Sequence, residues 1–143
     1  RYSDAQSACQ AAGKRLCTES EWRTACRGGM TTPAQFKNIG QLAQHCDVAR
    51  PRGYKDYVGK TDAHPNCPAP GLAVYNMIGN VAEYVTADTG EAMIVGLAFG
   101  DGTPDTIART LAHACEKTVK AAGTYRPFKY YNARGFRCCR DTN

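Results

Sequence analysis

Two features are missing from this chain, and each absence excludes a class of protein. There is no run of about 18 apolar residues, so we expect no membrane span. No charged-then-apolar leader precedes Arg1, so we expect that any signal peptide is already gone. The 18 basic residues outnumber the 13 acidic ones and give a charge of +5, but they are scattered. Nothing therefore demands a nucleic-acid partner.

The sequence also lacks a C-x-x-C pair, although it contains eight cysteines: Cys9, Cys17, Cys26, Cys46, Cys67, Cys115, Cys138 and Cys139. The short paired spacing of structural zinc sites is thus absent, and disulfides are the favoured interpretation. The zinc alternative would use three histidines close to cysteines, namely His45 with Cys46, His64 with Cys67, and His113 with Cys115. Disulfides persist in oxidising compartments, which indicates a secreted, cell-surface or periplasmic protein.

Helical periodicity is sparse and confined mainly to the start of the chain. A length of 143 residues suits one domain with one core. Residues 30–70 and 86–110 are punctuated by glycine and proline, which predicts two long irregular regions. A loop as long as the first is uncommon unless it is functional or pinned, and Cys46 and Cys67 are available to pin it.

Two helices are predicted before residue 30. The segment Ser3–Gly13 begins with a capping serine and ends at a glycine. Its apolar face would carry Ala5, Ala8, Cys9 and Ala12. Thr18 and Glu21 then form a capping box, which predicts a helix from Glu19 to about Arg27 that ends at Gly28-Gly29. Its apolar face would carry Trp22, Ala25 and Cys26, with the only tryptophan as a core anchor.

The carboxyl-terminal part gives weaker structural signals. Residues 108–120 suit a third helix, although a strand around Cys115 is the alternative. Residues 135–140 suit a final strand. The basic residues near this end could meet an anionic glycan or phosphate, or could simply be solvated surface; they are Lys129, Arg134, Arg137 and Arg140.

The segment YNMIGNVAEYV, residues 75–85, gathers oxygen ligands and a glycine turn before a strand. Calcium takes six to eight oxygens from carboxylates, amide side chains and backbone carbonyls. Asn76 and Glu83 offer side-chain oxygens, and a turn at Gly79 would direct the carbonyls of Gly79 and Val81 towards the same spot. The alternative is a polar turn with a solvated Glu83.

Three segments in order resemble the formylglycine-generating enzyme, or sulfatase-modifying factor, family. They are GKRLCTESEW at 13–22 followed by RGG at 27–29, GLAVYNMIGNVAEYV at 71–85, and GFR at 135–137. The family signature is a GKRLPTEAEWE helix start, a GLYDMxGNVWEW loop and a terminal GFR strand. The resemblance implies an α+β, C-type lectin-like fold of the formylglycine-generating-enzyme type over residues 1–143, with two amino-terminal helices, a small antiparallel sheet and much irregular loop.

The resemblance also implies a disulfide pattern. It pairs Cys9 with Cys138 and Cys26 with Cys115. We then expect Cys17 with Cys139, and Cys46 with Cys67, although other pairings of these four cysteines stay open.

Family members hold a structural calcium ion at the glycine loop, which here implies Asn76, the Gly79 and Val81 carbonyls, and Glu83. No second calcium site has a counterpart in Asp47–Asp62. The family's catalysis does not carry over, because its copper-binding cysteine pair falls at Asp105–Thr110, where this chain has no thiol. We therefore expect no copper and no enzyme activity.

Family members have a strand before the first helix, whereas this chain starts almost at that helix. We expect that the strand is either trimmed or supplied by another subunit through strand addition.

Three functions fit these observations. The leading one is a non-catalytic, secreted, calcium-stabilised module that recognises a protein or glycan through the loops Thr31–Asn66 and Thr86–Thr110. Sugar binding lacks its usual EPN, QPD and WND motifs. The second is a structural subunit of an extracellular filament or surface assembly, as a homo-oligomer or fibre. The third is an enzyme with some other chemistry.

Overall fold

The computed structural model describes residues 1–29, 74–98, 113–121 and 134–141, and these form a mixed α+β core. The helices are α1 (Tyr2–Ala11) and α2 (Glu19–Gly29). The strands are β1 (Arg15–Leu16), β2 (Ala82–Thr86), β3 (Ala92–Val95), β4 (Thr118–Lys120), β5 (Arg134–Phe136) and β6 (Cys138–Cys139). No helix in these four ranges is long and apolar enough to cross a membrane.

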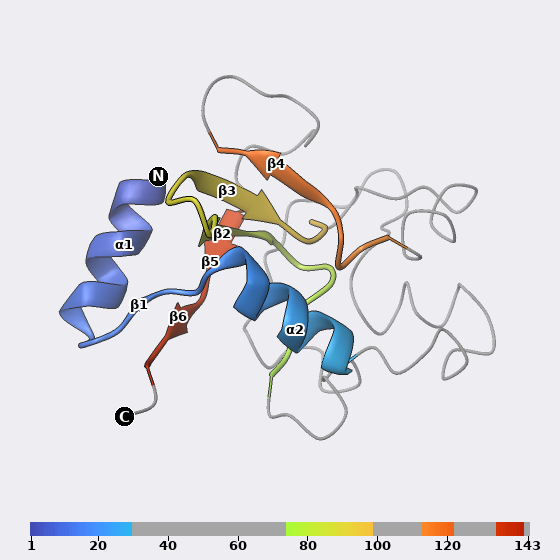
Figure 1. Cartoon of the computed structure of the whole chain (residues 1–143), viewed down its shortest axis with the longest axis horizontal. Helices are drawn as coiled ribbons and strands as arrows, with labels where there is room; N and C mark the ends of the chain where they lie inside the picture. The colour runs from blue at the N-terminus through green and yellow to red at the C-terminus, as the bar shows by residue number, and fades with distance from the viewer. Residues whose placement is uncertain (30–73, 99–112, 122–133, 142–143) are drawn as a thin grey trace.

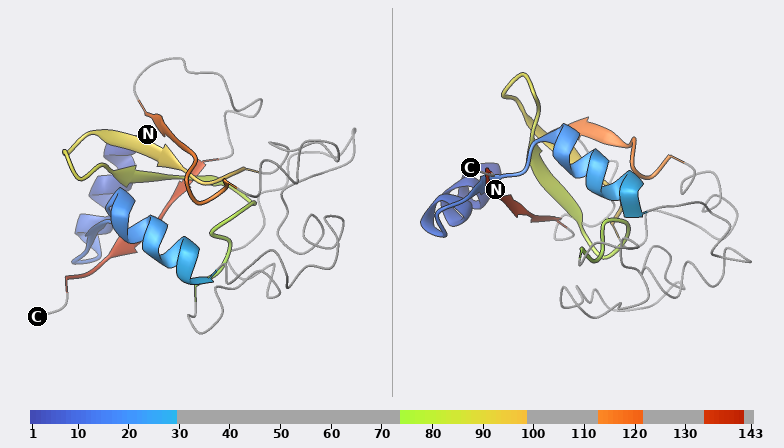
Figure 2. Two further views of the ribbon diagram at one scale, coloured as in Figure 1. Left: turned by 45° about the vertical axis from the view of Figure 1, so that its right-hand side comes forward. Right: turned by 60° about the horizontal axis from the view of Figure 1, so that its bottom comes forward.

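The strands form two sheets. One has the order β4-β3-β2-β5, in which β2 pairs antiparallel with β3 and parallel with β5. The other joins β1 to β6, with Leu16 opposite Cys138. Helix α2 lies across one face of the larger sheet, while α1 lies beside β1 and β6 (Figures 1 and 2). The sequence expectation of an α+β domain with small sheets is confirmed, but the expectation of an antiparallel sheet is wrong at one edge, because β5 lies beside β2 and runs in the same direction.

The main core lies between α2 and the larger sheet. Trp22, Val85 and Leu97 are each at most 2% exposed there. Because side chains alternate along a strand, Glu83 and Val85 share the β2 face that meets α2, and Tyr84 lies on the opposite face. Gly96 lets the tryptophan ring approach the chain, since a Cβ there would lie 3.0 Å from the Trp22 ring, and its φ of +79° suits glycine.

Helix α2 begins as the sequence predicts. The Thr18 backbone N–H donates to Glu21 Oε2 at 2.8 Å, and the Glu21 N–H donates to Thr18 Oγ1 at 3.2 Å. This capping box is therefore confirmed. The helix continues through Gly29, two residues beyond the predicted end at Arg27.

Helix α1 differs in detail from the prediction. It begins at Tyr2, so Ser3 lies inside the helix and is not its cap. The Tyr2 hydroxyl is 2.8 Å from Thr86 Oγ1, and this tertiary contact fixes the first turn. Ala5 and Cys9 are buried as expected, but Ala8 and Ala12 are exposed because α1 contacts the remaining structure along a narrow face.

The later elements correct three further expectations. Strand β3 lies within the region predicted to be irregular, and its Met93–Val95 segment is buried between β2 and β4. The helix predicted over 108–120 is wrong for 113–120, which forms a turn and then β4. The single final strand is divided into β5 and β6 at Arg137. Residues 108–112 lie outside the described ranges.

Candidate metal-binding loop and its buried ion pair

The four proposed calcium ligands lie within eight residues, 76–83, that form a loop and the first two residues of β2. Asn76 is 4% exposed and Glu83 is 5% exposed. Asn76, Gly79 and Asn80 have positive φ angles of 56°, 86° and 58°. Glycine and asparagine tolerate this left-handed region better than other residues, which explains their presence in this turn.

The loop is anchored to the core on both sides. The Gly79 N–H donates to the Leu97 carbonyl at 3.1 Å. The Val81 side chain packs against Gly135, where an added Cβ would lie 2.7 Å from Val81 Cγ2. Glycine at position 135 therefore allows β5 to lie directly against the end of the loop.

Glu83 is not the solvated residue of the simple-turn alternative. Its Oε2 accepts a hydrogen bond from Trp22 Nε1 at 2.7 Å and another from Arg137 Nε at 2.6 Å. Burial raises the pKa of Glu83 above its ordinary value, while the Arg137 charge and the two hydrogen bonds oppose this rise. Both hydrogen bonds end on Oε2, so Oε1 takes part in neither of them.

Arg137 joins the two ends of the loop. Its Nη2 donates to the Tyr75 carbonyl at 2.5 Å, next to Asn76, while its Nε pairs with Glu83. The Arg137 side chain is 20% exposed. The sequence drew attention to this residue only as part of a basic end and of a GFR motif, and its partner Glu83 is 54 positions away.

The expected basic surface at the carboxyl-terminal end is not one continuous patch. Arg137 is committed to Glu83, and Arg134 lies 5.9 Å from the centroid of the Tyr84 ring and donates to the Tyr84 hydroxyl at 3.1 Å. Arg140 is exposed, and Lys129 lies outside the described ranges. The sequence grouped these residues by position, whereas packing gives the three described arginines different environments.

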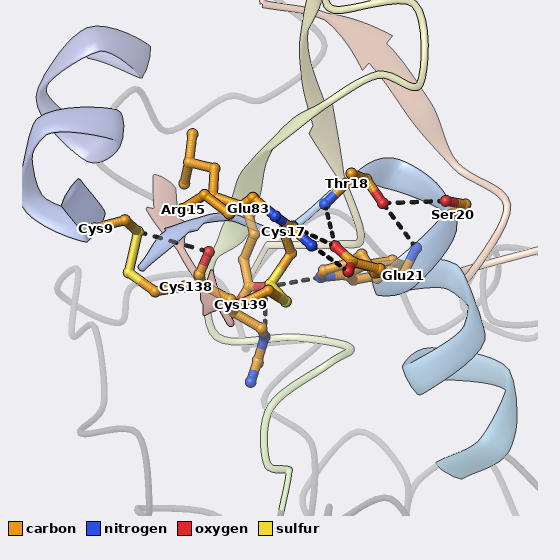
Figure 3. The surroundings of a disulfide bond; sticks show 12 residues. Cys9, Arg15, Cys17, Thr18, Ser20, Glu21, Glu83, Cys138 and Cys139 are labelled. Atoms are coloured by element: carbon orange, nitrogen blue, oxygen red, sulfur yellow. Dashed lines mark hydrogen bonds and ion pairs between the residues drawn. A yellow bond between two sulfur atoms is a disulfide. The ribbon is translucent and has the colours of Figure 1, made fainter. Parts of the chain in front are cut away.

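Three disulfides join the described parts of the chain. They are Cys9–Cys138, Cys17–Cys139 and Cys26–Cys115, three of the four pairs expected above. The adjacent Cys138 and Cys139 therefore reach two different partners, and Figure 3 shows these two bonds. The Cys115 thiol is unavailable to the zinc alternative, and Cys46 and Cys67 lie outside the described ranges.

The donor set fits calcium chemically, because an amide side chain, a carboxylate and backbone carbonyls are all hard oxygen ligands. Within the described ranges there is no group of three histidine, cysteine, aspartate or glutamate side chains that could hold a metal. Of the four proposed ligands, only Glu83 is a carboxylate, and the others are neutral oxygens.

Comparison with known proteins identifies the family. The model of the sulfatase-modifying factor enzyme 1-like domain matches residues 1–142. The chain belongs to this family. The resemblance inferred from the three sequence segments is thereby confirmed.

Two curated relatives are formylglycine-generating enzymes. The one from Mycobacterium tuberculosis is 36% identical over 94 residues, which cover 61% of this chain and 31% of the relative. The one from Mus musculus is 31% identical over 97 residues, covering 59% of this chain and 25% of the relative. The alignments thus span about a quarter to a third of each relative. No solved structure matches the chain.

Proposed function

We propose that this family member is a non-catalytic, secreted binding module on a C-type lectin-like scaffold, stabilised by disulfides and by calcium. The cysteine inventory carries the proposal. Six of the eight cysteines are joined in the described disulfides, and the other two, Cys46 and Cys67, lie outside the described ranges. Residues 105–110, where the family's copper-binding pair would fall, contain no cysteine.

This inventory argues against the chemistry suggested by the names of the two relatives. A Cu(I) site selects soft thiolate ligands, and a disulfide sulfur is not a thiolate. The pairing of Cys46 with Cys67, expected from the sequence, would remove the last two thiols. The three described disulfides also support an oxidising, extracellular location.

The proposed calcium ligands are Asn76 and Glu83 through their side chains and Gly79 and Val81 through their carbonyls. When bound, the ion would supply a charge that fixes the loop and would take no part in a reaction. The buried position of Asn76 and Glu83 supports this role, since Asn76 lies in the loop before β2 and Glu83 is the second residue of β2.

The structure narrows the proposed recognition surface. The loop Thr86–Thr110 was one candidate, but its Met93–Ala98 segment is buried and belongs to the core. We therefore assign recognition to Thr31–Asn66 and to the parts of Thr86–Thr110 on either side of that buried segment; of these, residues 31–66 and 99–110 lie outside the described ranges.

The test of this proposal is a direct activity assay. The purified chain is loaded with Cu(I) in air and incubated with a cysteine-containing peptide, alongside the Mycobacterium tuberculosis relative as a positive control. Mass spectrometry should detect aldehyde only in the control reaction. Aldehyde formation by this chain would overturn the proposal.

The binding part needs its own measurement. The labelled chain is applied to protein and glycan arrays, and hits are titrated by surface plasmon resonance. A saturable ligand that is lost after reduction and unfolding is expected. Regular filaments of the pure protein in electron micrographs, without any such ligand, would instead favour the structural-subunit alternative.

A further inference from the structure

The buried carboxylate of Glu83 already has a cation beside it. Arg137 Nε lies 2.6 Å from Glu83 Oε2, and the glutamate side chain is only 7% exposed. An ionised carboxylate is strongly disfavoured in a protein interior unless it is paired and hydrogen-bonded. Arg137 and the Trp22 N–H meet this requirement with residues of the chain itself.

The same arginine also spans the loop. Arg137 Nη2 donates a hydrogen bond to the Tyr75 carbonyl, and Arg137 Nε donates one to Glu83. A single guanidinium therefore connects the residue before the first proposed ligand with the last proposed ligand. Bringing a backbone carbonyl and a carboxylate towards a common positive charge is what a bound cation does in such a loop.

We propose that Arg137 is a built-in counter-cation that holds residues 75–83 in place before calcium binds, so that calcium adds stability to a loop that is already formed. The inference rests on the calcium site of the proposed function, and it adds to that site a counter-charge supplied by the chain itself. Trp22 is the positioning residue that fixes the Glu83 carboxylate for both cations.

The backbone of Arg137 is fixed by its neighbours. Its carbonyl accepts a hydrogen bond from the Cys17 N–H at 3.2 Å. The next two residues, Cys138 and Cys139, are bound to Cys9 and Cys17 through disulfides. Pairing the guanidinium with Glu83 then costs side-chain rotamer entropy but little backbone entropy, because the backbone is already immobilised.

Charge determines how strongly calcium can compete. The affinity of a calcium loop depends on the charge of its ligands and on the rigidity of the site. Glu83 and Arg137 together carry no net charge, so an added calcium ion gains little net electrostatic attraction. We expect a dissociation constant in the weak extracellular range, about 10⁻⁴–10⁻³ M.

The experiment measures Tm in a chelator and in 5 mM CaCl₂ for the wild type, Arg137→Gln and Arg140→Gln. For the wild type, a dissociation constant near 1 mM gives a calcium shift of about 2–4 °C. Arg137→Gln leaves Glu83 buried without its counter-charge, so its Tm in chelator should fall by roughly 10 °C. Calcium should recover at least half of that loss.

Arg140→Gln is the matched control, because it removes an exposed charge three residues away and should behave like the wild type. If Arg137→Gln does not fold, Arg137→Lys keeps the charge but loses the two-point bridge, and it should show a larger calcium shift than the wild type.

The outcomes separate the two proposals. A larger calcium shift in the Arg137 variant than in the wild type and the control supports the counter-cation. An equal or smaller shift, with the wild type still stabilised, overturns the counter-cation and leaves the calcium site standing. No calcium shift in any variant overturns both.

Discussion

The two ends of the described core are stabilised in different ways. Next to α2, eleven buried residues form the main cluster, and one disulfide, Cys26–Cys115, crosses it. Around α1, β1 and β6 the cluster has three buried residues, Ala5, Cys9 and Leu16, and two disulfides cross this second region. We call it the terminal clamp.

The difference shows that covalent bonds replace burial where burial is scarce. A small cluster contributes little hydrophobic free energy, and small secreted units commonly compensate with disulfides. The terminal clamp also fixes the backbone next to Arg137, which is the counter-charge of Glu83. Glu83 itself lies on the β2 face that meets α2, in the main core. The two regions are therefore joined by one buried ion pair.

The largest expected effect comes from removing both disulfides of the terminal clamp. Each closes a long loop, with sequence separations of 129 and 122. The two loops overlap almost completely, however, so once one disulfide is formed the other closes a loop of only about 10 residues. In the chain-entropy model, removing either pair costs about 3 kcal/mol and removing both costs roughly 7–8 kcal/mol.

The test is a double-mutant cycle in urea with Cys9→Ala/Cys138→Ala, Cys17→Ala/Cys139→Ala and the combined variant. Mass spectrometry of each variant checks that the remaining pairs are unchanged. If the loss of unfolding free energy in the combined variant equals the sum of the losses in the two separate variants, the two disulfides act independently. That result would contradict the claim that each disulfide partly replaces the other in the terminal clamp.

The next effect concerns the hydrogen bond that joins α2 to Glu83. Trp22→Phe keeps a ring in the main core but removes the Nε1 donor. We expect a loss of about 2–4 kcal/mol in the free energy of unfolding, from the lost charged hydrogen bond and the smaller ring. The double variant Trp22→Phe/Glu83→Gln should lose less free energy of unfolding than the sum of the losses in the two single variants. A double-variant loss equal to that sum would argue against the hydrogen bond.

A smaller effect is expected where β5 meets the loop. Gly135→Ala places a Cβ 2.7 Å from Val81 Cγ2, and the rest of the strand must shift, which costs roughly 1–3 kcal/mol. Val81→Ala in the same chain should recover part of the loss, measured by urea unfolding. Gly13→Ala is the control for backbone strain alone, since φ is +66° there and the space around it is open.

A structural feature could be predicted from the sequence when the residues that form it lie close together along the chain. The capping box of α2 joins residues three apart, so the sequence reveals it directly. The cluster of Trp22, Glu83 and Arg137 joins positions separated by 61 and 54 residues, and no local pattern reports such pairs.

The errors have physical causes of the same kind. Residues 113–120 contain helix-forming residues, but the disulfide at Cys115 and the pairing of β4 with β3 impose a turn and a strand. Strand β3 was missed because Ala92–Val95 is short and apolar, without alternation, as expected for a strand buried in the sheet. The disulfide pairing came from the family resemblance rather than from spacing.

The smallest expected effect is a pH dependence of the unfolding free energy, from an ion pair between β1 of the terminal clamp and the start of α2. Arg15 pairs with Glu21 and lowers the pKa of this carboxyl to about 2. Since the pKa is depressed on folding, the stabilisation is present above the unfolded value of 4.5 and is lost as the pH falls towards 2. Solvent screening limits it to about 1 kcal/mol, because both side chains are more than a third exposed.

This effect is checked with Glu21→Gln, compared with the wild type by chemical unfolding between pH 2 and 7. The gap between the two proteins should close between pH 4.5 and 2. A constant gap over that range would show that the pair contributes through packing rather than charge.

The central claim is that the cysteines of this chain serve structure and leave no thiol for copper chemistry. The most direct measurement is peptide mapping of the unreduced protein after alkylation under denaturing conditions. We predict no alkylated cysteine and four linkages: Cys9–Cys138, Cys17–Cys139, Cys26–Cys115 and Cys46–Cys67. Alkylation at Cys46 and Cys67, together with stoichiometric Cu(I) binding by the native protein, would contradict the claim.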